Sequence, residues 1–256
     1  MATRLEAPAQ EPRDVKREVR LTGITRRFGD LTALDDVSLR AGADEVVAVV
    51  GPSGSGKSTL LELVCGLQRP DAGRVDVGGR AVLMPQRDLL LPWLDALDNA
   101  ALPLRLAGVK RAAARARARE LLGELGLGGF EGARTWELSG GMRQRVAVAR
   151  TLLSGAPILC LDEPFGALDA ITRADAQSWL AGVLAREPRT VLLVTHDVEE
   201  AALLADRVLV LSPRPGRVVA DLPVPLSRGS AARSPTDPAV VAIRAQALDA
   251  LRGGRG

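Results

Sequence analysis

A glycine-rich stretch that ends in lysine is the part of this sequence with the clearest chemistry. It matches the pattern G-x-x-x-x-G-K-[ST] and consists of Gly51, Pro52, Ser53, Gly54, Ser55, Gly56, Lys57, Ser58 and Thr59. The apolar run 46–50 before it is typical of a buried strand, and the pattern after it is typical of a helix. In that setting backbone N–H groups converge on phosphate oxygens, Lys57 contacts the β- and γ-phosphates, and Ser58 coordinates Mg²⁺. The alternative is a glycine-rich turn with a surface lysine.

Two carboxylates and the only histidine of the chain also stand where strands are expected to end. Asp162 and Glu163 follow the apolar run 158–161, and His196 follows the run 191–195. Ligands bind at this edge of open α/β sheets, so we expect Asp162 to hold Mg²⁺ through water and Glu163 to act on an attacking water. The alternatives are solvated carboxylates at a strand end and a structural histidine.

Length and composition limit the class of protein. The chain has 256 residues, 46% of them apolar and 25% charged, with a net charge of +3 that singles out no partner. These values fit one large α/β domain or two small ones and argue against a disordered or collagen-like chain. Cys65 and Cys160 lie in apolar runs, which favours buried reduced thiols in a cytosolic protein, and one histidine is too few for a zinc site. Neither a transmembrane run nor a secretion signal is expected.

Alternating apolar patterns predict a parallel sheet with a helical insert. Residues 19–48 have a β-like pattern, and residues 95–154, rich in alanine, leucine, arginine and glutamate, are expected to be helical. The other expected strands are 46–50, 74–77, 81–84, 157–161, 190–194 and 207–211. Helices are expected from Lys57 or Ser58, from Leu168 and from Val198, so that strands and helices alternate as in a parallel α/β sheet.

The two ends of the chain have their own patterns. Residues 1–18 are rich in proline and charge, and we expect a frayed tail there. Residues 226–238 are rich in serine, arginine and proline and are expected to form a loop. A last helix would follow, with an apolar stripe of Val240, Ile243, Ala247, Leu248 and Leu251. This stripe predicts a helix that docks on the domain, with a regulatory helix as the alternative.

A further motif, LSGGMRQR, occupies residues 138–145, and its serine is expected to cap a helix. With the phosphate loop, the carboxylate pair and His196, it resembles the signature motif of the ABC ATPases, and the resemblance covers residues 19–222. It implies an α/β fold of the P-loop NTPase (RecA-like) kind, with a parallel-sheet core, an antiparallel β part and an inserted α-helical subdomain at about 87–154. The ATPase domain would be residues 19–225, followed by the C-terminal loop and helix at 226–256.

The resemblance also implies roles for individual residues. Phe28 stands where an aromatic ring stacks on adenine, and Gln86 stands in the Q-loop, which approaches nucleotide and Mg²⁺. The alternatives are a core residue beside a turn for Phe28 and a solvated loop amide for Gln86. The residues that would serve catalysis are Lys57, Glu163 and His196, of which His196 contacts the γ-phosphate.

The signature residues imply a second subunit. In the family, residues matching Ser139, Gly140 and Gly141 meet the γ-phosphate of ATP held by the partner's phosphate loop, and Asp169 lies in the D-loop at 165–169. One phosphate loop and one signature in this chain therefore imply a head-to-tail homodimer that holds two ATP·Mg²⁺.

Two stretches resemble one branch of the family. LLLPW at 89–93 and SPRPGR at 212–217 are similar to segments of the ATPases for nitrate, sulfonate, taurine and pyrimidine-precursor uptake. Met84-Pro85-Gln86 and Thr135-Trp136 depart from the usual pattern of that branch, and the Q-loop region, which includes Gln86, faces the permease in the family. We therefore expect an importer subunit at the cytoplasmic face of the membrane, with permease subunits and, indirectly, an extracytoplasmic substrate-binding protein as partners.

Other classes of ABC ATPase share the catalytic motifs. An export or lipoprotein-extraction ATPase differs only in its permease, and a non-transport ATPase acting on nucleic acid would carry a second cassette, coiled-coil arms or a zinc module, which this sequence lacks. We expect no nucleic-acid partner. A row of arginines on the helical insert is typical of a solvated helix face, and the alternative is a surface that binds lipid headgroups or RNA. These residues are Arg111, Arg115, Arg117 and Arg119.

Overall fold

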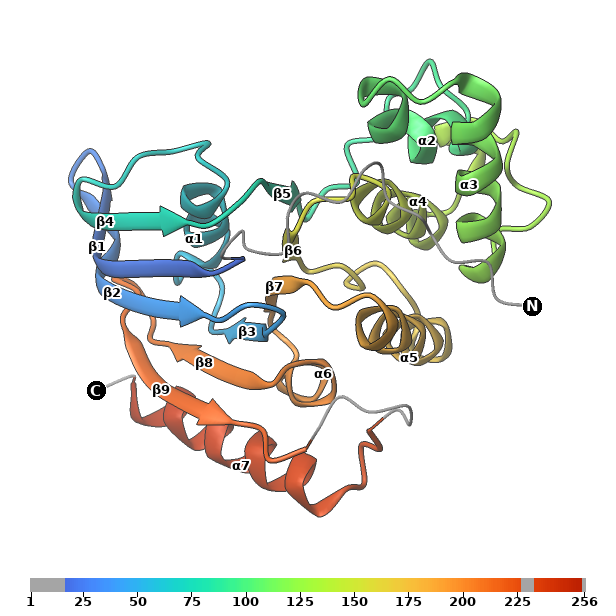
Figure 1. Ribbon diagram of the computed structural model, residues 1–256. Helices are drawn as coiled ribbons and strands as arrows, with labels where there is room; N and C mark the ends of the chain where they lie inside the picture. Colours follow the sequence, from blue (N-terminus) through green and yellow to red (C-terminus); the bar gives the residue numbers. More distant parts are fainter. Residues whose placement is uncertain (1–16, 227–232, 255–256) are drawn as a thin grey trace. The chain divides into compact units, whose positions relative to one another are not determined.

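The computed structural model describes residues 17–226 and 233–254, which fold into two compact units (Figure 1). The core unit comprises the described residues of 17–83, 157–163 and 177–254, and the helical unit comprises residues 84–156 and 164–176. Most of the tail expected at 1–18 and the middle of the loop expected at 226–238 lie outside the described residues.

A six-stranded sheet runs through the core unit in the order β5-β6-β7-β3-β8-β9. Its strands are β3 (Val46–Val50), β5 (Ala81–Met84), β6 (Ile158–Asp162), β7 (Thr190–Thr195), β8 (Arg207–Leu211) and β9 (Val218–Pro223). β3, β6 and β7 are buried along their whole length, as their continuous apolar runs predict for strands covered on both faces. β6, β7, β3 and β8 run parallel, whereas β9 is antiparallel and was not expected from the sequence.

The register of the central strands brings the polar residues of the sequence motifs to one edge. Val50 of β3 pairs with Thr195 of β7, and Asp162 of β6 pairs with Val194. The phosphate loop, the carboxylate pair and His196 therefore leave three neighbouring strands at their carboxyl ends, which is where ligands bind in open α/β sheets.

A second, antiparallel sheet covers one face of the first. Its order is β2-β1-β4, with β1 (Val19–Phe28), β2 (Leu31–Ala41) and β4 (Ala72–Val77). With α1 (Lys57–Val64) it packs on alternate residues of the large sheet, and the shared core includes Leu21, Leu34, Leu60, Val47, Val49 and Leu192. α6 (Val198–Leu204) contacts β3, β7 and β8. Cys160 is buried as predicted, whereas Cys65, at the end of α1, is half-buried; both thiols are free.

Three α-helices pack against one another in the helical unit: α2 (Ala96–Leu106), α3 (Arg111–Glu124) and α4 (Gly140–Leu152), with a short 3₁₀ turn, η1, at Thr135–Glu137. Asp95 caps α2 by accepting a hydrogen bond from the Asp98 N–H at 2.6 Å. Arg111 and Arg115 form ion pairs with Asp98 at 2.8 and 2.7 Å, so two of the four arginines of the predicted solvated face bind within the unit. α5 (Ala170–Arg186) begins in the helical unit and continues into the core unit.

The last helix, α7 (Pro238–Gly253), packs against α6, β8 and β9. Asp237 caps it, with its carboxylate accepting a hydrogen bond from the Ala239 N–H at 2.9 Å. Val240, Ile243 and Ala247 are buried, which confirms the centre of the predicted apolar stripe, but Leu248 is 37% exposed and the stripe is narrower than expected. Across residues 17–226 and 233–254, no helix combines the length and the apolar character that crossing a membrane requires.

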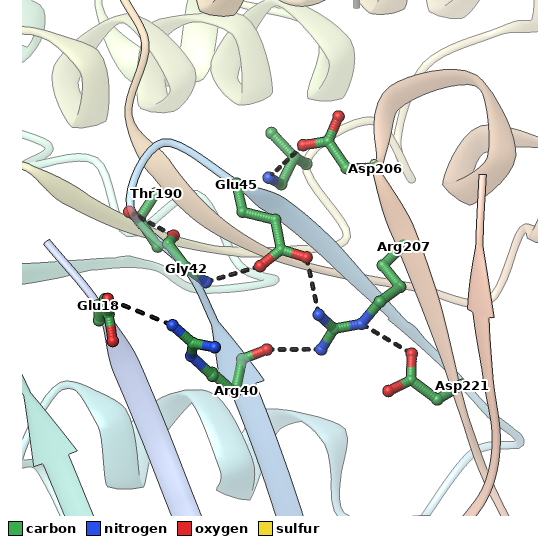
Figure 2. Close-up of polar contacts among 9 residues, drawn as sticks. Glu18, Arg40, Gly42, Glu45, Thr190, Asp206, Arg207 and Asp221 are labelled. Carbon is green, nitrogen blue, oxygen red and sulfur yellow. Dashed lines mark hydrogen bonds and ion pairs between the residues drawn. The ribbon is translucent and has the colours of Figure 1, made fainter. Parts of the chain in front are cut away.

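An ion-pair network fixes the end of the large sheet opposite the phosphate loop (Figure 2). The Arg207 guanidinium contacts the Glu45 carboxylate at 2.8 Å and the Asp221 carboxylate at 2.7 Å, and it donates to the Arg40 carbonyl at 2.6 Å. Asp206 accepts a hydrogen bond from the first N–H of β3 at 2.8 Å. The start of β3, and with it the register of the strand that leads into the phosphate loop, is therefore held by side chains of β8 and its preceding turn.

We predict that Arg207→Ala lowers the free energy of unfolding by about 1–3 kcal/mol, because the half-buried Glu45 carboxylate, the exposed Asp221 carboxylate and the Arg40 carbonyl lose a charged donor. Urea denaturation measures the change. Arg74→Ala is the matched control, because Arg74 is 78% exposed and its ion pair with Asp76 is open to solvent. Equal losses for the two variants would show that the network does not stabilise the sheet.

Candidate nucleotide site

The phosphate loop connects β3 to α1 and depends on two left-handed glycines. Gly54 has φ +80° and Gly56 has φ +89°, and a side chain at Gly56 would place its Cβ 2.5 Å from Leu34 Cδ2. No side chain caps α1 at Gly56, so the first N–H groups of this helix have no side-chain acceptor. A loop of this kind, at the start of a helix, is suited to bind an anion through backbone N–H groups.

Lys57 is the charged centre of the loop. Its side chain is buried, and Nζ donates hydrogen bonds to the carbonyl oxygens of Gly51 at 2.8 Å and Pro52 at 2.9 Å. Burial lowers the pKa of Lys57, and the charges of Glu163 and Asp162 oppose this shift only in part. The Ser55 hydroxyl is also buried and has no hydrogen-bond partner. A bound phosphate would supply a negative charge beside Lys57 and an acceptor for the Ser55 hydroxyl, so these residues fit a nucleoside triphosphate.

Asp162 ends β6 beside the start of α1. It is buried and accepts a hydrogen bond from Ser58. Burial raises the pKa of the Asp162 carboxyl, and the neighbouring Glu163 charge raises it further. One carboxylate and one hydroxyl fit Mg²⁺, which usually binds one or two protein oxygens and completes its shell with phosphate and water. Nowhere in the described chain do three or more histidine, cysteine or acidic side chains cluster as a metal site.

Glu163 and His196 meet next to these residues. The Glu163 N–H donates to the Val194 carbonyl at 2.8 Å, and its φ of +48° turns the chain away from the sheet. Left-handed φ is unfavourable for a glutamate, and such residues concentrate at functional sites. His196 Nδ1 lies 3.2 Å from Glu163 Oε1, and the histidine side chain is 62% exposed. The arrangement places a carboxylate and an accessible imidazole in contact at the edge where the phosphate loop opens.

Phe28 ends β1 and is not a core residue. Its side chain is 43% exposed, and the Arg26 guanidinium lies 4.6 Å from the centroid of its ring. Arg26 is itself held by Gln68 at 2.9 Å and by Asp71 at 3.1 Å. A cation on one side of the ring orders it, so Phe28 is a fixed aromatic surface on the core unit.

The helical unit contains the other predicted site residues. Ser139 caps α4, as predicted, by accepting a hydrogen bond from the Met142 N–H at 3.2 Å. Gly140 opens the helix, and a side chain at Gly141 would lie 2.8 Å from Leu168 Cδ2, so the start of α4 packs closely on residues 165–169. The Asp169 carboxylate accepts a hydrogen bond from the Thr172 N–H at 3.1 Å.

The structure thus brings together one group of predicted residues in the core unit: residues 51–59, Asp162, Glu163 and His196. Phe28 belongs to the same unit. Gln86, which is exposed, belongs to the helical unit with Ser139, Gly140, Gly141 and Asp169. The nucleotide contacts assigned to each of these residues stay predictions.

Comparison with known proteins gives consistent results. A family model described as ABC transporter matches residues 34–166. The taurine import ATP-binding protein of Burkholderia thailandensis is 51% identical over 76% of this chain and 78% of its own length. The aliphatic sulfonates import ATP-binding protein of Rhodococcus jostii is 47% identical over 90% of this chain and 92% of its own. A solved dimeric ATP-binding cassette bound to ADP and Pi has a TM-score of 0.75 and 30% identity, and the match covers 82% of this chain and all of that one.

The raised pKa of Asp162 predicts opposite effects on stability and on ligand binding. Burial disfavours the ionised Asp162 carboxylate in the folded protein. The folded state therefore loses stability as the pH rises from 3.8, the pKa in the unfolded chain, to the raised pKa of the folded protein. Above that raised pKa the loss is complete. At pH 7 we expect Asp162→Asn to raise the Tm of the nucleotide-free protein by about 2–4 °C and to abolish the further rise given by Mg²⁺ with ATP.

Thermal unfolding with and without Mg²⁺·ATP measures both effects. Asp169→Asn is the control, because hydrogen bonds from Thr172 lower the pKa of that exposed carboxyl, and its removal should not raise the Tm. A Tm increase for both variants, or a Mg²⁺·ATP shift retained in Asp162→Asn, would contradict the role assigned to Asp162.

Proposed function

The chain belongs to the ABC transporter family and is one of its ATPases, and on this premise we propose that it powers an importer for taurine or a related sulfonate. The observation that carries the proposal is the buried Lys57 ammonium beside Asp162 and Glu163, in a chain about half identical to import ATP-binding proteins of taurine and sulfonate systems. Residues 19–225 would form the ATPase domain.

In this proposal the core unit binds ATP by charge and by backbone geometry. Lys57 turns from the Gly51 and Pro52 carbonyls to the β- and γ-phosphates, and residues 53–56 donate backbone N–H groups. Ser58 and Asp162 of the core unit would hold Mg²⁺, which would neutralise phosphate charge when bound. Phe28, ordered by Arg26 and partly exposed, would stack on adenine. Apart from this movement of Lys57, binding needs little rearrangement because the backbone donors are already held in place.

Hydrolysis needs a water aligned with the γ-phosphate. Glu163 accepts a hydrogen bond from that water and takes its proton as the water oxygen attacks phosphorus and ADP leaves. His196 lies 3.2 Å from Glu163, is accessible, and contacts the γ-phosphate in this proposal. The hydrogen bond of the Glu163 N–H to Val194 fixes the backbone from which the carboxylate acts.

A second copy of the chain completes the site. Ser139, Gly140 and Gly141 stand at the N-terminus of a 13-residue helix, whose partial positive charge suits a γ-phosphate held by the partner. Asp169 lies in the loop on which Gly141 packs. The solved cassette of similar fold is a dimer, which supports this arrangement. ATP binding would close the dimer and hydrolysis would reopen it.

The loop at 87–94 is our candidate for the contact with the permease. Leu89 is 61% exposed and Trp93 is 68% exposed, yet their backbone is firmly held. Arg150 donates to the Leu89 carbonyl at 2.9 Å, and Arg134 donates to the Trp93 carbonyl at 2.7 Å. Rigid, exposed apolar side chains are typical of interaction sites. The protein would sit peripherally on the cytoplasmic face of the membrane, and the permease would connect it to an extracytoplasmic substrate-binding protein.

The proposed role of Glu163 predicts a specific loss. Glu163→Gln should lower ATP turnover by about 10²- to 10⁴-fold, the range for a positioned general base, and leave ATP affinity unchanged. Phosphate release and calorimetric titration measure the two quantities. Glu120→Gln, on the exposed surface of α3, is the control and should keep parental turnover. Turnover of Glu163→Gln within about threefold of the parent would remove Glu163 from this role.

The proposed solute predicts a growth phenotype. Deletion of the gene from its source organism should abolish growth on taurine or another sulfonate as sole sulfur source and leave growth on sulfate unchanged. A plasmid with the parental gene should restore growth, whereas one with Glu163→Gln should not. Normal growth of the deletion strain on every sulfonate tested, with ATPase activity of the purified protein intact, would refute the solute and leave the ATPase assignment standing.

A further inference from the structure

The loop at 212–217, between β8 and β9, is built as a rigid support. The Ser212 N–H donates to the Arg217 carbonyl at 2.9 Å, and the Arg217 N–H donates to the Ser212 hydroxyl at 3.0 Å, so the loop is closed at its base. Gly216 is bonded to β2 on both sides: its N–H donates to the Ala33 carbonyl at 2.9 Å, and its carbonyl accepts from Asp35 at 3.0 Å. Prolines on either side of Arg214 restrict its backbone further.

This support contacts two consecutive residues of the phosphate loop. A Cβ at Gly216 would lie 2.0 Å from the Ser55 carbonyl oxygen, so only glycine allows this approach. Arg214 Nε donates a hydrogen bond to the Gly54 carbonyl at 3.1 Å, and its guanidinium lies over the position that a side chain at Gly54 would occupy. Nothing in the sequence places Arg214 at this point, because the two segments are 160 positions apart.

The contact acts on the orientation of one peptide group. A loop that binds phosphate must keep its carbonyl oxygens away from the anion, because a carbonyl facing phosphate repels it. Gly54 has no side chain to restrict its backbone and takes a left-handed φ of +80°. The guanidinium can only donate hydrogen bonds, so Arg214 fixes the direction of the Gly54 oxygen, toward the 212–217 loop. Its charge also raises the positive potential at the phosphate site.

We propose that Arg214 is a positioning residue for ATP binding, which holds the phosphate loop in its binding conformation before the nucleotide arrives. The inference rests on the proposed function, since it assumes that residues 51–59 bind ATP. In this proposal the 212–217 loop, which resembles a segment of the sulfonate and taurine branch, supports the nucleotide site. Pre-organisation of this kind improves affinity without contributing to the chemical step.

The test compares the mobility of the phosphate loop with nucleotide affinity in full-length Arg214→Ala. Hydrogen exchange of the nucleotide-free protein should show amides of residues 53–57 exchanging at least about threefold faster than in the parent. The Kd for Mg²⁺·ATP should rise about three- to tenfold, the loss expected for an exposed charge-assisted hydrogen bond. Turnover at saturating ATP should stay within about twofold of the parent, because Arg214 does not act on the reacting atoms.

Three further variants separate positioning from a general effect on folding. Arg214→Lys keeps a charged donor and should recover at least half of the lost affinity; if Arg214→Ala does not fold, Arg214→Gln is expected to show the same rise in Kd. Arg252→Ala, at an arginine 77% exposed on α7, should behave as the parent. The proposal is overturned if Kd and loop exchange in Arg214→Ala equal those of the parent, or if only the Tm falls. If the parent itself does not bind Mg²⁺·ATP, the proposed function fails as well.

Discussion

The burial of one ammonium group beside two carboxylates is the constraint on which the rest of this structure depends. Lys57 is held by two backbone carbonyls, and its burial is strong enough to lower its pKa against the attraction of Asp162 and Glu163. A buried ammonium of this kind is unfavourable unless a bound anion compensates its charge. The charges can stay together only because three neighbouring parallel strands end at the same edge, and the register of β3 is fixed from the far end by the Arg207 network.

The same requirement explains the unusual backbone around the site. Gly56 lies against Leu34 and Gly216 against the Ser55 carbonyl, at distances that no side chain would allow. Glu163 takes a left-handed conformation although it is not glycine, and its N–H is bonded to Val194. These features cost conformational energy and contribute nothing to the hydrophobic core. They are understandable as the means by which backbone donors and a carboxylate are presented to a phosphate chain.

Much of this could be predicted from the sequence, because the residues involved are local. The continuous apolar runs predict β3, β6 and β7, and the cap of α4 follows from a serine before a helical pattern. β9 could not be predicted, because it is a half-buried edge strand whose pattern includes aspartate and ends at proline. Leu248 and Cys65 are more exposed than their apolar neighbourhoods indicate, since burial depends on what packs against them. The contact of Arg214 with Gly54 is tertiary and has no local signal.

The most direct test of nucleotide binding at this edge is a calorimetric titration of Mg²⁺·ATP into the parent protein and into Lys57→Ala. Binding of ATP to the phosphate loop through a buried ammonium predicts saturable binding of one nucleotide per chain, weakened by about tenfold or more in the variant. Equal affinity of the two proteins would mean that ATP binds elsewhere, and it would contradict the roles of Lys57, Asp162 and the edge of the sheet that brings them together.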